Sequence, residues 1–311
     1  LQELITDIAG ISLPDKVKAK NVAVTGLTSD QIKVMDSAQL QSLTTAQMKV
    51  LSTDQMTALT SVQMSKLTSQ QMSVLTASQF TALVANTAEM KTLSTDQIRG
   101  LSNSVLTSIT STNLQVMTTD QIQALSTSQV KALTSAQITN LTTGQVKALT
   151  TAQVSVLSAT QIAAIETEDL VKLAADQIAS LSKSMVTALT TAQTANLTSA
   201  QLGAMNSSQV QGLSATQLKA LTTAQISKIG SAQISALSAT QISAIESQDV
   251  ASLTTDQIST LTATQVRALS SSQLVAMTTA QISKIGTQQI AALNAAQLSA
   301  LQTEDLAQLT Q

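Results

Sequence analysis

An eight-residue sequence repeats from Leu27 to Gln308, and this repeat constrains the fold more than any other feature of the chain. Its consensus is Leu-Ser/Thr-x-x-Gln-Ile-x-Ala, and 34 copies occur, with a single ten-residue unit at 83–92 interrupting the phase. A short and persistent period is typical of proteins in which each unit packs only against its neighbours. The sequence therefore predicts an array of stacked units in place of two ordinary globular domains.

Position 2 of the octad, counted from the leucine, carries the residue types that begin helices. It is Ser or Thr in 25 copies and Asp, Asn or Gly in five more, all of which favour a helix N-cap. Position 5 is Gln in 28 copies, and a Gln three residues after the cap completes a capping box. Leu at position 1 and Ile at position 6 then stand where a hydrophobic staple forms. Each octad therefore predicts the start of a helix.

The charged residues of the octads are distributed as a short helix favours. All 14 acidic residues lie at positions 2, 4 or 5, and 11 of the 12 basic residues lie at positions 7 or 8. Carboxylates stabilise the first turn of a helix and cations the last turn, because the peptide dipoles align along the helix axis. The pattern predicts one helix in each octad, spanning positions 3 to 8.

A helix this short is unstable alone, so its stability must come from stacking on other units. The predicted fold is an all-α solenoid with three or four octads per superhelical turn, in which positions 1, 6 and 8 form the buried apolar face. A continuous helix is excluded, because an octad is about 80° out of phase with the helical period. A β-solenoid is the alternative, favoured by the Thr, Val and Ile content. Eight Gly and one Pro are too few for its corners.

Two regions are predicted along the chain. Residues 1–26 do not follow the repeat and form an N-terminal segment or cap, with a short strand and turn at 21–26. Residues 27–311 form the octapeptide-repeat solenoid, including the irregular unit at 83–92. The repeat ends without a recognisable cap, so we expect it to continue into a larger chain or to associate end to end with another copy.

Composition excludes most catalytic and ligand-binding chemistry. The chain has no His, Cys, Trp or Tyr, and Phe80 is its only aromatic residue. It therefore lacks an imidazole base, a thiol nucleophile and aromatic platforms for bases. Charged residues make up 11% of the chain and the net charge is −2, which is not the electrostatic footprint of a nucleic-acid-binding protein. We predict no enzyme, no catalytic, metal or cofactor site, and no membrane span.

Acidic clusters and a methionine run are the two residue groups with chemistry of their own. The acidic clusters could bind calcium weakly through oxygen ligands, but the sequence favours cap and dipole variants of the usual box, because the clusters keep the octad register. The methionines recur at position 6, which predicts core packing. The clusters are Glu166, Glu168 and Asp169, Glu246 and Asp249, and Glu304 and Asp305, and the run is Met48, Met56, Met64, Met72 and then Phe80.

The segments ALTTAQV at 148–154 and ALTTAQI at 220–226 carry a resemblance to a known class of repeats. Over residues 27–311 the chain resembles tandem octapeptide arrays of very large secreted or surface proteins of bacteria, often labelled adhesion or haem-utilisation proteins. The resemblance implies an extracellular or cell-surface location and a structural or adhesive role. Haem binding is not expected, because no His, Tyr or Cys is present as an axial ligand.

Two functions follow as expectations. The first is a non-enzymatic extracellular structural protein, the shaft or subunit of a bacterial surface fibre or filament. The alternative is an adhesin-type binding module that displays a glycan-, protein- or ice-binding surface on the variable positions 3, 4 and 7. The expected partners are another copy of the chain, surface glycans or neighbouring cells, and not nucleic acid.

Overall fold

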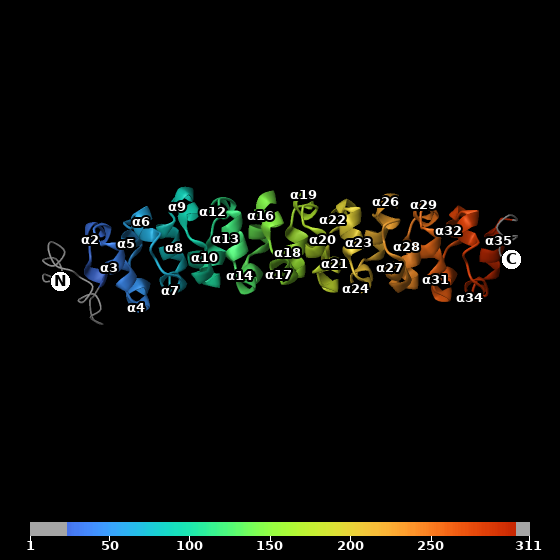
Figure 1. Cartoon of the computed structure of the whole chain (residues 1–311), viewed down its shortest axis with the longest axis horizontal. Coiled ribbons are helices and arrows are strands. Elements are labelled where there is room, and N and C mark those ends of the chain that lie inside the picture. Colours follow the sequence, from blue (N-terminus) through green and yellow to red (C-terminus); the bar gives the residue numbers. More distant parts are fainter. Residues whose placement is uncertain (1–23, 303–311) are drawn as a thin grey trace. The chain divides into compact units, whose positions relative to one another are not determined.

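The structure, a computed structural model, describes residues 24–302 and is helical throughout this range (Figure 1). It contains a 3-10 turn, η2 (Val24–Gly26), and 34 α-helices of four to seven residues, with no strand among the described residues. The predicted all-α fold is therefore confirmed and the β-solenoid alternative is wrong. The strand predicted at 21–26 is wrong for its described part, because η2 occupies residues 24–26.

The chain divides into two compact units, Leu1–Leu149 and Thr150–Gln311. The predicted division at residue 27 stays a prediction. The helices of the first unit are α2 (Ser29–Lys33), α3 (Ser37–Ser42), α4 (Thr45–Lys49), α5 (Thr53–Thr57), α6 (Ser61–Met64), α7 (Ser69–Ser73), α8 (Ala77–Leu83), α9 (Thr87–Thr92), α10 (Thr95–Gly100), α11 (Asn103–Ser108), α12 (Ser111–Gln115), α13 (Thr119–Ala124), α14 (Thr127–Ala132), α15 (Ser135–Thr139) and α16 (Thr143–Ala148).

The second unit is built in the same way, with one helix in each octad of residues 149–300. Its helices are α17 (Thr151–Ser155), α18 (Ala159–Ala164), α19 (Thr167–Leu170), α20 (Ala175–Ala179), α21 (Lys183–Ala188), α22 (Thr191–Asn196), α23 (Ser199–Ala204), α24 (Ser207–Val210), α25 (Ala215–Lys219), α26 (Thr223–Ile226), α27 (Ser231–Ala236), α28 (Ala239–Ala244), α29 (Ser247–Ala251), α30 (Thr255–Ser259), α31 (Ala263–Ala268), α32 (Ser271–Ala276), α33 (Thr279–Ile282), α34 (Thr287–Ile290) and α35 (Ala295–Ala300).

Most of the described helices begin at the capping boxes that the sequence predicts, and α13 shows the arrangement. The Thr118 hydroxyl accepts a hydrogen bond from the Gln121 N–H at 3.2 Å, and Gln121 Oε1 accepts one from the Thr118 N–H at 2.8 Å. The helix ends at Ala124 because Leu125, position 1 of the next octad, has φ −58° and ψ 130° and leads the chain into the next cap. The prediction of one helix in each octad, beginning at position 3, is confirmed for the described octads, and most of these helices end between position 6 and position 8.

The buried face differs from the predicted one at two positions of the octad, 5 and 8. Positions 1 and 6 are buried in nearly all described octads, as at Leu125 and Val130, which are 3% and 0% exposed. Position 8 is mostly half-buried or exposed, so its predicted place in the buried face is wrong. Position 5 is buried although position 8 is not. Every position-5 glutamine between Gln47 and Gln297 is no more than 9% exposed. A polar side chain therefore forms part of the core.

Within each unit, a helix packs on the helix three places further along the chain. In the first unit α10 packs between α7 and α13, and in the second α29 packs between α26 and α32 (Figure 1). The other strongly contacting pairs follow the same rule. Three octads therefore complete one superhelical turn, which is one of the two values that the sequence predicts.

The irregular unit at 83–92 is accommodated without breaking this stacking. Helix α8 continues through Leu83, and the extra residues lie before Asn86, which caps α9 with its side-chain oxygen. Helix α8 still packs on α5 and α11, and α9 on α12. The two additional residues thus lengthen one connection and leave three helices in each turn.

Two glycines in the first unit should respond oppositely to alanine. A Cβ on Gly100 would lie 2.3 Å from the Ser69 carbonyl oxygen on the adjacent turn, whereas a Cβ on Gly144 would meet nothing within 4 Å. Gly144→Ala should stabilise the fold by about 1 kcal/mol through helix propensity. Gly100→Ala should destabilise it by about 1–3 kcal/mol through overpacking. Urea unfolding of both variants measures the difference, and a similar stabilisation at the two sites would contradict the close approach of α7 and α10.

The cap hydroxyl should contribute measurably at a single octad. Ser238 Oγ accepts a hydrogen bond from the Gln241 N–H at 3.2 Å at the start of α28. Ser238→Ala is expected to cost about 0.5–2 kcal/mol of stability. Ser272→Ala, at an exposed position within the first turn of α32, is the matched control and should be neutral or slightly stabilising. Thermal unfolding compares the two, and equal midpoints would contradict the capping role.

Candidate functional site

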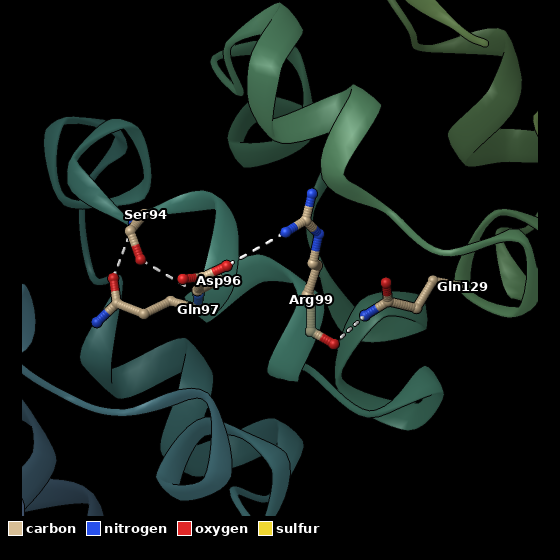
Figure 2. Close-up of polar contacts among 5 residues, drawn as sticks. All are labelled: Ser94, Asp96, Gln97, Arg99 and Gln129. Atoms are coloured by element: carbon tan, nitrogen blue, oxygen red, sulfur yellow. Dashed lines mark hydrogen bonds and ion pairs between the residues drawn. The ribbon is translucent and has the colours of Figure 1, made fainter.

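The side chain at position 5 links successive superhelical turns. Gln129 Oε1 accepts a hydrogen bond from the Ser126 N–H, the cap of α14, at 2.8 Å. Its Nε2 donates to the carbonyl oxygens of Ile98 at 3.0 Å, Arg99 at 3.2 Å and Leu101 at 2.8 Å. Figure 2 shows the bond to the Arg99 carbonyl, together with the capping box that Ser94 and Gln97 form at the start of α10. One amide therefore joins the start of a helix to the end of another.

We call this arrangement the glutamine bridge: a position-5 Gln that accepts from its own N-cap N–H and donates to carbonyls about one turn earlier. The second unit repeats it at Gln265, whose Nε2 donates to Ile234 at 2.9 Å and Leu237 at 2.7 Å, residues 31 and 28 positions earlier. Helix ends leave backbone groups without intrahelical partners. Since every helix here is short, such groups are unusually numerous, and the bridge satisfies both kinds at once.

In three octads the residue at position 5 is neither Gln nor a charged residue. Val105 is 0% exposed and substitutes packing for the amide, whereas Met185, 3% exposed, accepts from the Ser182 N–H through its sulfur at 3.3 Å but has no donor. Asn113 has a shorter side chain and keeps one donor, from Nδ2 to the Val84 carbonyl at 3.3 Å. The bridge is thus used at most octads but is not indispensable at each one.

The glutamates of two acidic clusters do not cap their helices, although the sequence predicts this role. Glu166 and Glu246 occupy the N-cap positions of α19 and α29, but neither side chain makes a capping hydrogen bond. The predicted cap function is therefore wrong for these two, since Glu is one methylene longer than the Asp that caps well. Asp169 and Asp249 lie at position 5 and are 5% and 1% exposed. The cluster of Glu304 and Asp305 lies outside the described residues.

Asp249 makes a side-chain contact with the previous turn. Its Oδ1 accepts a hydrogen bond from the Thr223 hydroxyl, on the first turn of α26, at 2.7 Å. Burial raises the pKa of Asp249 above its ordinary value, the Thr223 hydrogen bond lowers it in part, and the Glu246 carboxylate adds to the increase. The structure thus places a carboxylate where most octads have a neutral amide.

A surface depression of about 700 Å³ lies between α25, α28, α29 and α32. Lys219 Nζ stands 4.0 Å from Glu246 Oε1 beside it, and both side chains are substantially exposed, so this pair contributes little stability. Gln273, which also lines the depression, is occupied by its bridge to Ile242 and Ile245. No buried side-chain nitrogen or oxygen of the described residues lacks a hydrogen-bond partner. The depression therefore offers no prepared polar group to a ligand.

The methionine run lies in the core, as the sequence predicts. Met48, Met56, Met64, Met72 and Phe80 are each no more than 1% exposed. Between residues 24 and 302, no three or more His, Cys, Asp or Glu side chains gather closely enough to hold a metal ion. No helix in the same range is long and apolar enough to cross a membrane.

The fold and the glutamine bridge together define a helical solenoid repeat protein. The sequence profile of the ALTTAQ repeat matches the chain seven times, and the matches cover more than half of it. The chain therefore belongs to the ALTTAQ repeat family. A search of the curated proteins gives no match. The matched segments are residues 24–61, 32–69, 106–143, 162–199, 194–229, 226–263 and 242–279.

Proposed function

We propose that the chain is a non-enzymatic structural protein located outside the cell, the shaft or subunit of a bacterial surface fibre. The glutamine bridge is the observation that carries this proposal. The most regular polar side chains of the repeat, Ser/Thr at position 2 and Gln at position 5, are engaged in capping helices and joining turns, as at Thr262 and Gln265. A repeat built in this way supports its own stacking and leaves few groups for chemistry.

The outward positions support the same proposal. Positions 3, 4 and 7 are mostly exposed, and most of them are Ser, Thr, Ala or other small uncharged residues. A shaft needs a soluble surface without a dedicated pocket, and each added octad stacks on units already present. The extracellular location rests on the resemblance to secreted and surface arrays. The adhesin alternative has weaker support, because the depression beside Lys219 and Glu246 presents no unpaired buried group.

Electron microscopy of the purified chain across a concentration series tests the structural role. Fibres with a regular axial repeat are expected if the chain is a filament subunit, and discrete particles that lengthen when 24 residues, or three octads, are added are expected if it is a shaft segment. Particles whose longest dimension does not increase with added octads would contradict both forms of the proposal.

Antibody labelling of cells that produce the protein tests its location separately. Labelling of intact cells is expected to equal that of permeabilised cells, with an internal protein as the control for cell integrity. Labelling that requires permeabilisation would contradict the extracellular proposal and leave the structural role standing.

A further inference from the structure

Asp249 interrupts a run of glutamine bridges on consecutive octads. The octad before it has Gln241, which donates to the Leu213 carbonyl at 2.7 Å, and the octad after it has Gln257, which donates to the Ile226 carbonyl at 3.3 Å. The carbonyls at the same spacings before position 249 belong to Leu218 and Leu221. An ionised carboxylate has no hydrogen to donate to them, and Asp249 contacts the Thr223 hydroxyl in their stead.

We propose that protonation of Asp249 controls how tightly α29 packs on α26. The two helices pack tightly when Asp249 is protonated and less tightly when its carboxylate is ionised. We call this helix contact the joint. Protonation removes a charge from a side chain that is 1% exposed, and it supplies position 249 with the donor that Gln supplies in other octads. Ionisation leaves the buried charge with a single hydroxyl partner, at 2.7 Å.

The charges around the joint also favour the protonated form of Asp249 over its ionised form. Helix α29 packs on α26 and α32, and neither of these helices contains a charged residue. Glu246, at the start of α29, repels a charge on Asp249 and raises its pKa further. Lys219 of α25 faces Glu246 at 4.0 Å and is mostly exposed, so solvent weakens its influence. No described cation contacts Asp249 to stabilise its ionised form.

The sign of the pH dependence follows from linkage. Because the pKa of Asp249 is raised in the folded chain, the folded form binds its proton more tightly than the unfolded form does. The stability that this proton contributes is present in acid, below the unfolded pKa, and is lost as the pH rises through the folded pKa. Since repeat units contact only their neighbours, the loosening is confined to the turns around α29.

Hydrogen exchange of the unmodified chain tests the joint. Amide protection in α29, corrected for intrinsic exchange and compared with α31, is expected to be higher at about pH 3 than at about pH 8, by about tenfold for each unit by which folding raises the pKa. Helix α31 is the internal control, because Gln265 forms its bridge without an ionisable group. A protection ratio that does not change with pH would overturn the proposal.

Two variants separate the charge from the shape of the side chain. Asp249→Asn is expected to abolish the pH dependence, and Asp249→Gln to give high protection at both pH values by restoring the bridge. If Asp249→Asn keeps the pH dependence of the unmodified chain, another group controls the joint and the proposal fails. Titration of the Asp249 carboxyl carbon by NMR in the unmodified chain gives an answer that needs no variant, and an ordinary aspartate pKa there would also overturn the proposal.

Discussion

Replacing Gln265 with Leu is expected to destabilise the chain by about 3–5 kcal/mol, although the two side chains are similar in size. Gln265 is 2% exposed, accepts from the Thr262 N–H at 2.8 Å and donates to the carbonyls of Ile234 at 2.9 Å and Leu237 at 2.7 Å. Leucine would leave the Thr262 N–H and the Leu237 carbonyl without their hydrogen-bond partners, at a cost of about 1–3 kcal/mol for each unsatisfied group, whereas the Ile234 carbonyl keeps the bond from the Leu237 N–H. The apolar surface that leucine adds offsets only part of this loss.

Gln288→Leu in α34 is the matched control, because it makes the same substitution at an exposed position in the same unit. Its effect on the urea midpoint should be small, since changes at exposed sites are usually within about 0.5 kcal/mol. Hydrogen exchange should locate the loss for Gln265→Leu at α31 and at the connection after α27. Equal midpoints for the two variants would show that the glutamine bridge contributes nothing to stability.

The local part of the fold could be predicted because its determinants lie within one octad. The cap at position 2, the Gln three residues later and the separated charges are all within eight residues, so each octad specifies its own helix. Thr118 and Gln121 form the box that this spacing predicts. The two apolar positions of the staple are also the buried ones, as Leu125 and Val130 show.

The second role of the glutamine could not be derived from one octad, because its partners lie 28 and 31 residues earlier. One signal in the sequence was available. A capping box accepts Glu as well as Gln, yet the 34 octads contain 28 Gln and no Glu at position 5. The carbonyl acceptor of Gln suffices for the cap, so the absence of Glu indicates that the amide donor makes a further contact at most octads. The irregular unit is the exception, because Glu89 stands in the place of the Gln there and accepts a hydrogen bond from the N–H of the cap, Asn86.

The exposure of position 8 and the contact of Asp249 with Thr223 could not be predicted for the same reason. Alanine at the end of a helix is apolar but small, and its burial depends on how closely the next turn approaches, as at Gly100 and Ser69. The Thr223 hydroxyl reaches Asp249 across 26 residues. Both features depend on the number of octads per turn, which the repeat limits to three or four but does not select.

Deleting a whole octad should be tolerated, whereas deleting half of one should not. Removal of Ser214–Leu221 joins Leu213 to Thr222, so that each following Gln still meets carbonyls at spacings of 28 and 31, now from the octad one place earlier. Removal of Ser214–Gln217 shifts the same spacings by four residues. The amides of Gln225, Gln233 and Gln241 then lose the carbonyls of Leu197, Met205 and Leu213.

Circular dichroism and hydrogen exchange distinguish the two deletions. The eight-residue deletion is expected to keep the helical content per residue and the protection of α26, α27 and α28. The four-residue deletion is expected to lose that protection, because three bridges of about 1–3 kcal/mol each are broken together. Helices α33 and α34 supply an internal reference, since their stacking partners all follow the deletion and keep their spacing. Equal protection of α26 to α28 in the two variants would mean that apolar stacking alone sets the register, without the glutamine bridges.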